Sequence, residues 1–145
     1  MSKSLDDVIN LVINSDPAKR SLGFKYIGKH RYTEATDFCL NALQHDDEED
    51  VRASAAWALD QINSPETVYE LIQALYDPCF SVRSNAGWGL VHIARRTIPH
   101  LVIPEVIDIL MESTDEDACQ MAYLVLHHIG GEEARSAINR YWKDR

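Results

Sequence analysis

The amino-acid sequence predicts an all-α solenoid, in which antiparallel helix pairs stack side by side. Three observations lead to this fold class. Residue patterns typical of helix starts recur along the chain, no stretch alternates polar and apolar residues for long enough to form a strand, and one block recurs at an offset of 31 residues. Self-similarity at a period of 20 to 50 residues is typical of stacked repeats rather than of a simple bundle.

The composition is that of an ordinary globular domain. The chain has 145 residues, of which 46% are hydrophobic and 26% charged, which fits one folded domain over residues 1–145. Its apolar stretches are interrupted before they reach the roughly 20 residues that span a bilayer, and its start lacks the apolar region of a secretory signal. We therefore expect a cytoplasmic protein that acts as a monomer and does not bind membranes.

Helix starts are marked by side chains that can accept hydrogen bonds from the free amide groups of a first turn. In chain order the predicted starts are Ser4 with Asp7, Asp16 before Pro17, Ser64 before Pro65, Asp77 before Pro78, and Thr114 with Asp117. Three of these starts place proline at the first helical position, where its missing N–H costs nothing.

The repeated block is clearest in the middle of the chain. Residues 50–62 match residues 81–93 at Val, Arg, Ala, Trp, Leu and Ile, and weaker copies lie around Arg20 and around Ala122. These copies predict about four helix pairs. The approximate repeats are 4–30, 33–62, 65–95 and 99–130, followed by a C-terminal capping helix at 132–142. The helices that partner the repeated blocks are expected at 4–14, 33–44, 65–76 and 102–113.

The central copies share the motif Asp-x(4)-Val-Arg-x-x-Ala-(Ala/Gly)-Trp-(Ala/Gly)-Leu-x-x-Ile, at residues 46–62 and 77–93. This motif resembles the HEAT-repeat family, in particular the short type called phycobilisome-lyase HEAT-like repeats. The resemblance implies a right-handed α-α superhelix of about four HEAT-like helix pairs plus the capping helix. In the outer copies Lys19-Arg20 and Ala118-Cys119 replace the Val-Arg pair, as suits terminal repeats that act as caps.

Two sets of repeated residues have structural interpretations. The apolar positions, spaced three and four apart, form one helical stripe and are predicted to be core: Val51, Ala55, Leu59, Ile62, Val82, Ala86, Leu90 and Ile93. Glycines at 87 and 89 cost helix stability, so we expect close helix packing there. The family resemblance implies that Arg52 and Arg83 pair with acidic residues of inter-repeat loops, such as Asp46 or Asp77.

Trp57 and Trp88 hold equivalent places on adjacent helices that should line the concave surface of the superhelix. Lys25 and Leu124 continue this row, and His127 lies one turn further along. Because aromatic side chains are enriched among binding hot spots, we predict a partner-binding set consisting of Trp57, Trp88, Asp60, Gln61, His92 and His128. A purely structural role stays open, in which the two indoles wedge between consecutive helices.

Motifs for catalysis are missing from the sequence. It contains no phosphate-binding glycine loop, no nucleophile elbow and no H-E-x-x-H motif. It also has no His-Glu dipeptide, on which iron-binding hydroxylases built from HEAT repeats rely. The acidic run at 46–50 has consecutive residues, unlike an EF-hand loop, and is expected to cap the next helix. The sequence therefore predicts no catalytic residues, no metal site and no cofactor.

The three cysteines, Cys39, Cys79 and Cys119, are odd in number and widely spaced, which predicts reduced thiols. Cys79 alone falls near a predicted helix start, where the dipole can favour a reactive thiolate.

The leading functional hypothesis is a non-catalytic protein–protein interaction scaffold or adaptor that binds another protein on its concave face. The alternative, implied by the family, is a phycobilin lyase subunit or bilin chromophore chaperone, with the tetrapyrrole stacked on Trp57 and Trp88 beside His92 or Asp60. A third hypothesis is a relative of the DNA glycosylases built of HEAT-like repeats. The formal net charge of −9 disfavours it and nucleic-acid partners generally, because phosphate backbones are repelled.

Overall fold

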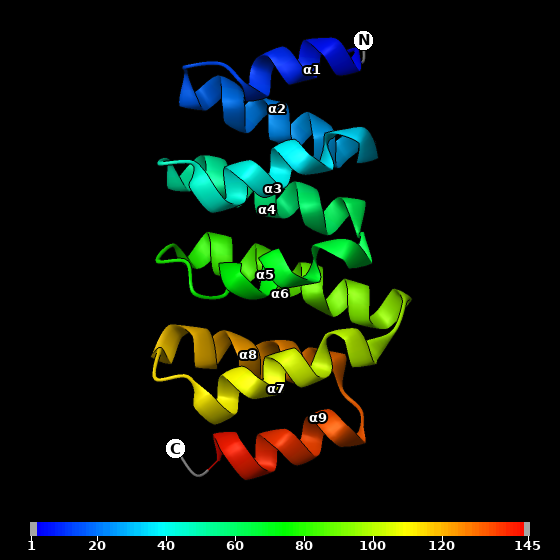
Figure 1. Cartoon of the computed structure of the whole chain (residues 1–145), viewed down its shortest axis with the longest axis vertical. Helices are drawn as coiled ribbons and strands as arrows, with labels where there is room; N and C mark the ends of the chain where they lie inside the picture. The colour runs from blue at the N-terminus through cyan, green and yellow to red at the C-terminus, as the bar shows by residue number, and fades with distance from the viewer. Residues whose placement is uncertain (1–2, 144–145) are drawn as a thin grey trace.

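The computed structural model describes residues 3–143, and within that range it contains helices and turns but no strand. The helices stack in two layers along one long axis, with the two ends of the chain at opposite ends of the stack (Figure 1). The predicted all-α solenoid is therefore confirmed. No helix among the described residues is long and apolar enough to cross a membrane.

The helices of one layer carry odd numbers and those of the other layer carry even numbers. The odd layer contains α1 (Leu5–Val12), α3 (Thr36–His45), α5 (Val68–Ala74) and α7 (Ile103–Glu112). The even layer contains α2 (Pro17–His30), α4 (Glu49–Ile62), α6 (Phe80–Arg96) and α8 (Glu116–Ile129). We call their outward surfaces the odd face and the even face.

Shorter elements connect and close the stack. Single 3-10 turns precede α3, α5 and α7, at Thr33–Ala35, Pro65–Thr67 and Pro99–Leu101. At the C-terminal end α9 (Glu132–Ala137) packs against α7 and α8 and continues into a π-helical turn, Ile138–Trp142. Each even helix packs on the odd helix before it, and α2, α4 and α6 each also pack on the next even helix.

The predicted helix starts agree with the structure at the N-terminal end. The Ser4 hydroxyl accepts a hydrogen bond from the Asp7 amide at 3.2 Å, and the Asp16 carboxylate accepts one from Ala18 at 3.0 Å. The prediction at Thr114 is wrong by one residue, because Asp115 caps α8 through the Ala118 amide at 3.0 Å. A carboxylate also interacts favourably with the positive end of the helix dipole, unlike a threonine hydroxyl.

One of the remaining predicted starts keeps its position and the other is displaced. Ser64 precedes the 3-10 turn that begins at Pro65, as predicted, but its hydroxyl makes no capping bond and instead donates to the Glu66 carboxylate at 3.0 Å. α6 begins at Phe80 rather than next to Asp77. The Asp77 carboxylate accepts from the Cys79 amide at 2.9 Å and is also engaged by an arginine of the preceding even helix, so it fixes the loop instead of capping the helix.

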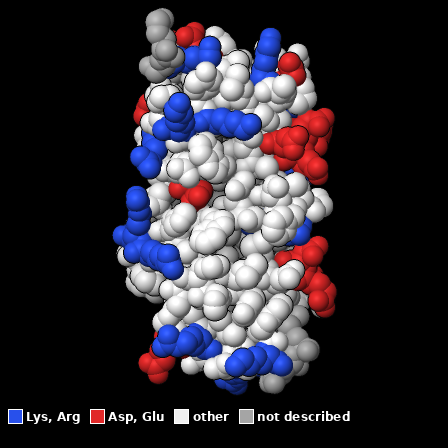
Figure 2. Space-filling model, turned by 180° about the vertical axis from the view of Figure 1, so that it is seen from behind, with Lys and Arg blue, Asp and Glu red and all other residues white. Residues whose placement is uncertain are grey.

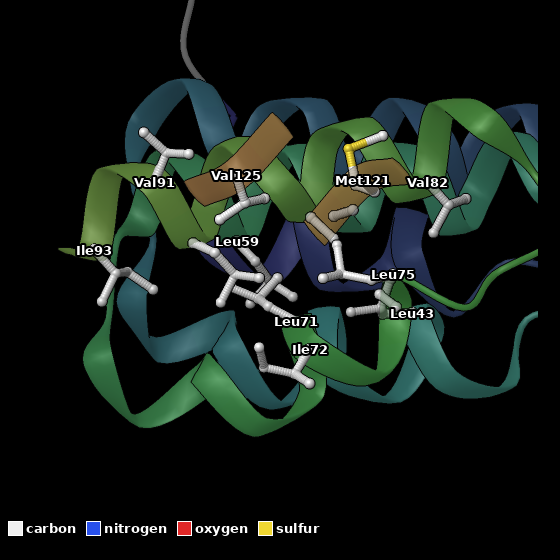
Figure 3. Packing of buried hydrophobic residues seen from close by; sticks show 14 of the residues in the cluster. Leu43, Leu59, Leu71, Ile72, Leu75, Val82, Val91, Ile93, Met121 and Val125 are labelled. Carbon is white, nitrogen blue, oxygen red and sulfur yellow. The ribbon is translucent and has the colours of Figure 1, made fainter. Parts of the chain in front are cut away.

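The core lies between the two layers and along the seams between even helices. Of the predicted stripe, Ile62 is half-buried, whereas the remaining members are completely enclosed: Val51, Ala55, Leu59, Val82, Ala86, Leu90 and Ile93. Figure 3 shows Leu59, Leu71 and Leu75 among the buried side chains of this core. Burying a leucine-sized side chain contributes roughly 1.5 to 3 kcal/mol, so these positions dominate the stability of the stack.

Candidate partner-binding face

Three hollows lie on the even face. The first, about 80 Å³ in volume, lies between α6 and α8 and is lined by Phe80, Ser84, Gly87, Trp88, Val91, Met121, Leu124, Val125 and His128. The second, about 480 Å³, is lined by Lys25, Lys29, Ala53, Ser54, Trp57 and Asn85. The third, about 160 Å³, is lined by Arg31, Asp60, Gln61, Asn63, His92 and Arg96.

All six residues of the predicted partner-binding set line these hollows. Trp57 lies in the second hollow, Trp88 and His128 in the first, and Asp60, Gln61 and His92 in the third. Lys25 and Leu124, which continue the row in the sequence, also line the second and first hollows. His127 does not line any of the three; its ring stacks on Tyr123 with the centroids 5.9 Å apart.

Trp57 is half-buried, and its ring packs against α2. Gly28 of α2 provides the space, because a Cβ atom at that position would overlap the Trp57 ring and lie 3.0 Å from the Ala58 Cα atom. The indole therefore acts as a wedge between α2 and α4, and only its remaining surface faces the second hollow. This arrangement corresponds to the structural role that the sequence left open.

Trp88 is 40% exposed. Its ring stacks on His92, four residues along the same helix, with centroids 5.8 Å apart, and contacts the His128 ring of α8 in a tilted arrangement at 4.7 Å. The indole thus turns away from α4 and towards α8. An indole held between two imidazoles presents a large apolar surface at little conformational cost, which is the usual character of a binding hot spot.

Asp60 and His92 form a pair across the seam between α4 and α6. The His92 Nδ1 atom lies 2.6 Å from the Asp60 Oδ1 atom, and the aspartate side chain is only 9% exposed. This contact fixes the His92 ring, which in turn supports the Trp88 indole. Asp60 therefore holds His92 in position and, through it, the Trp88 ring.

The two faces differ in charge. The three hollows of the even face are lined by four Lys or Arg residues and one acidic residue, Asp60. The two hollows described on the odd face are lined by five acidic residues and no basic one: Glu34, Asp37, Glu66, Glu70 and Asp77. Figure 2 shows the even face, with Lys and Arg mainly on its left side and at its two ends, the largest patches of Asp and Glu on its right edge, and a mostly uncharged band in the middle.

An arginine near the start of each of α2, α4 and α6 faces the loop before the next even helix. We call this series the arginine ladder and each arginine with its carboxylate a rung. The Arg20 guanidinium donates two bonds to the Asp46 carboxylate, at 2.9 and 3.1 Å, and Arg52 donates two to Asp77, at 2.9 and 3.2 Å. The bond to Asp46 raises the pKa of Arg20, and the bond to Asp77 raises that of Arg52. Each rung ties one even helix to the loop before the next.

Arg83 occupies the same place in α6, but its rung is incomplete. Its Nη1 atom donates to the carbonyls of Asp77 and Pro78, as Arg52 does to the two carbonyls at the start of its own loop. The Arg83 Nε atom is buried and has no hydrogen-bond partner, and the Arg83 Nη2 atom lies 3.9 Å from the Asp117 carboxylate. Asp46 and Asp77 stand two residues before their helix caps, and the equivalent residue before α8 is Ser113.

The described residues contain no group of three or more His, Cys, Asp or Glu side chains arranged to hold a metal ion. Cys39 is enclosed, and burial raises the pKa of its thiol to about 12, so it stays protonated and unreactive at neutral pH. Cys119 is also buried, and its thiol donates to the carbonyls of Ile109 and Ser113. Cys79 is half-buried.

Several residues of the even face were missed from the sequence: Lys29, Arg31, Phe80 and Arg96. The basic ones lie at or just beyond helix ends, where a cation is expected because of the helix dipole, so they carried no distinctive signal. Arg20 was noted only as part of a weak copy, although its offset of 32 residues from Arg52 could have placed it in the ladder.

Comparison with known proteins gives a family and a set of similar folds. A family model described as HEAT repeats matches residues 5–91. A search of curated proteins found no match.

Among solved structures, the crystal structure of an engineered protein superposes with a TM-score of 0.66 at 18% identity, covering 97% of this chain and 68% of that one. A designed armadillo repeat protein, in complex with the peptide (KR)4, gives 0.58 at 18% identity, covering 96% and 70%. Human deoxyhypusine hydroxylase, in complex with glycerol, gives 0.52 at 20% identity, covering 92% of this chain and 54% of that one. At these identities the likeness establishes the fold.

Proposed function

The chain belongs to the HEAT-repeat family, and from that premise we propose that it is a non-catalytic scaffold that binds another protein along its even face. The observation that carries the proposal is Trp88, which is 40% exposed on the seam between α6 and α8 and is held by two histidine rings. A large apolar side chain that is fixed in place and left open to solvent favours a protein contact over a core role.

Two further features support a partner on this face. The three hollows follow one another along the even helices, so that one bound segment could contact Trp57, His92 and Trp88 in turn. Stacked repeats also bind peptides along such rows of helices in other proteins, and the designed armadillo repeat protein was solved with a peptide bound. We extend that mode of binding, though not the identity of the peptide, to this chain.

Affinity capture with the intact protein, followed by mass spectrometry, identifies the partner, and paired variants then locate its binding site. Trp88→Ala should weaken the captured complex by at least about tenfold, as expected for an aromatic hot spot. Tyr69→Ala is the control, because Tyr69 is an aromatic of α5 that is 69% exposed and does not line the even-face hollows. Full affinity in Trp88→Ala, or an equal loss in Tyr69→Ala, would show that the partner binds elsewhere.

Bilin binding, as in a lyase subunit or a chromophore chaperone, remains a second candidate because of the hollow next to Trp57. Its volume of about 480 Å³ lies within the range of small-molecule sites, and Lys25 and Lys29 could pair with the propionate groups of a tetrapyrrole. Adding a free bilin and recording its visible spectrum tests the idea. A spectrum that does not shift, in the presence of folded protein, removes it.

A further inference from the structure

We infer that the segment that binds the even face is acidic as well as apolar. This inference rests on the proposed function, since it assumes that the partner occupies the three hollows. It adds the chemistry of the partner. The distribution of charge differs between this face and the rest of the chain.

The chain as a whole has 23 acidic and 14 basic residues. Around the even-face hollows the balance is reversed, with four basic residues and one acidic one. Apolar hollows that are bordered by basic residues are complementary to a partner that is both apolar and negatively charged. The acidic residues of the odd face and of the acidic edge of the even face would repel the same partner, which favours the basic hollows.

The four cations are available for a partner. Lys25, Lys29 and Arg96 are exposed and form no salt bridge within the described residues. Arg31 donates only its Nε proton, to the Gln61 carbonyl at 3.1 Å, which leaves the rest of its guanidinium open. The helix dipole explains cations in the last turns of α2 and α6, but Lys25 lies in the middle of α2, where that explanation does not apply.

The single carboxylate of these hollows does not oppose an acidic partner strongly. The Asp60 side chain is only 9% exposed, and one of its oxygens is held 2.6 Å from the His92 ring. The surface above it is therefore contributed mainly by the histidine and by the neighbouring arginines, Arg31 and Arg96. A carboxylate of the partner could approach these guanidinium groups and form the bidentate contacts that arginine favours.

The spacing of the helices suggests the pattern of the bound segment. Adjacent packed helices lie roughly 8 to 10 Å apart, and a polyproline II chain advances about 9 Å in three residues. An apolar side chain at every third residue would therefore meet successive even helices, at Trp57 and then at Trp88. Acidic side chains between them would reach the basic residues of the second and third hollows.

Three synthetic peptides test this inference by fluorescence anisotropy on the intact protein. In the acidic peptide the triplet Leu-Glu-Ser is repeated four times, and Gln or Lys replaces Glu in the neutral and basic versions. We expect the acidic peptide to bind at least about tenfold more tightly than the neutral one, with a preference that shrinks as salt rises. We expect the basic peptide to bind most weakly.

Matched charge reversals locate the effect. Lys25→Glu with Lys29→Glu should remove the preference for the acidic peptide. Lys19→Glu with Arg135→Glu should keep it, because these two exposed residues change the net charge equally but line none of the even-face hollows. Circular dichroism confirms that both double variants remain folded.

Equal binding of the acidic and neutral peptides, or the same loss in both double variants, would overturn the inference. The Trp88→Ala capture experiment decides the proposed function independently, because its partner is identified without any assumption about charge. If no peptide binds while Trp88→Ala still loses the captured partner, the acidic partner is excluded and the scaffold role stands.

Discussion

α4 and α6 carry nearly the same sequence, yet the structure uses the shared residues differently. In α4 the motif tryptophan, Trp57, is packed onto Gly28, and the motif arginine, Arg52, is bound by a carboxylate. In α6 the tryptophan, Trp88, is 40% exposed, and the arginine, Arg83, has a buried Nε atom without a partner. The motif residues of α4 are therefore held by the neighbouring repeats, Trp57 at the closed junction with α2 and Arg52 at the junction with α6. Those of α6 leave the junction with α8 open.

The neighbours of the motif explain this difference. Trp57 can lie against α2 because a glycine leaves room for the ring, whereas Trp88 instead packs beside His92 and His128. Arg52 is satisfied by Asp77, but Ser113 stands at the equivalent position for Arg83. A motif residue in a solenoid thus becomes structural or available for binding according to what the adjacent repeat provides.

The largest loss of stability is expected when the tryptophan of the closed junction between α2 and α4 is removed. Trp57→Ala should lower the free energy of unfolding by about 3 kcal/mol, because it removes the wedge between α2 and α4 and leaves a cavity. Trp88→Ala should cost less than about 1 kcal/mol, since much of that ring already faces solvent. Urea denaturation followed by circular dichroism measures both. Equal costs for the two variants would contradict the assignment of the wedge to Trp57 alone.

The next largest loss of stability is expected when the Arg52–Asp77 pair loses its carboxylate. Asp77→Ser copies the residue found before α8 and should cost about 2 kcal/mol or more, because the Arg52 and Asp77 side chains are only 14% and 10% exposed and the remaining charge loses its partner. Urea unfolding of the variant gives this cost. Substituting the exposed Asp47 by Ser is the control and should change the stability little. The rung would be shown to be unimportant if the two variants were equally stable.

A smaller loss of stability is expected at Gly28, the residue that leaves room for the Trp57 ring. Gly28→Ala should destabilise the protein by about 1 to 2 kcal/mol, although alanine favours helix, because the new methyl group overlaps the Trp57 ring. In a Trp57→Ala background most of this cost should disappear, as a double-mutant cycle would show. Additive effects of the two substitutions would mean that the glycine and the indole are not in contact.

The smallest change in stability is expected when Arg83 is given a carboxylate partner. Ser113→Asp should raise the free energy of unfolding by about 1 kcal/mol, because it offers a carboxylate to the unsatisfied Arg83 Nε atom. Combining it with Arg83→Lys should remove the gain, since lysine cannot reproduce the two-bond contact. A gain that persists with lysine would reflect general charge effects on the neighbouring helix start instead.

How far the sequence predicted this structure depends on the distance between interacting residues. The apolar stripe and the N-terminal helix starts were predictable, because their periods and caps are local properties of the chain. The six residues predicted to bind a partner do line the even-face hollows, because equivalent positions in stacked repeats must lie in a row. That row alone does not establish binding.

Other features could not be predicted, because they depend on contacts between repeats. Nothing local in the two motif copies indicates that Trp57 turns towards α2 and Trp88 towards α8. That choice depends on Gly28, some 29 residues before the first tryptophan, and on His128, some 40 residues after the second. The charge difference between the two faces was also hidden, since basic residues at helix ends are common and acquire meaning only when the hollows they border are known.

We expect the open junction at Trp88 to contact the partner, while the closed junction at Trp57 mainly holds the stack together. Two-dimensional NMR of the indole N–H groups, recorded while the acidic triplet peptide is added, distinguishes these two roles. The largest shift is expected for Trp88, a smaller one for Trp57 and none for Trp142, whose ring stacks on Tyr123 at the C-terminal end. Saturable binding that moves the Trp142 signal most, or leaves Trp88 unchanged, would contradict this assignment of roles.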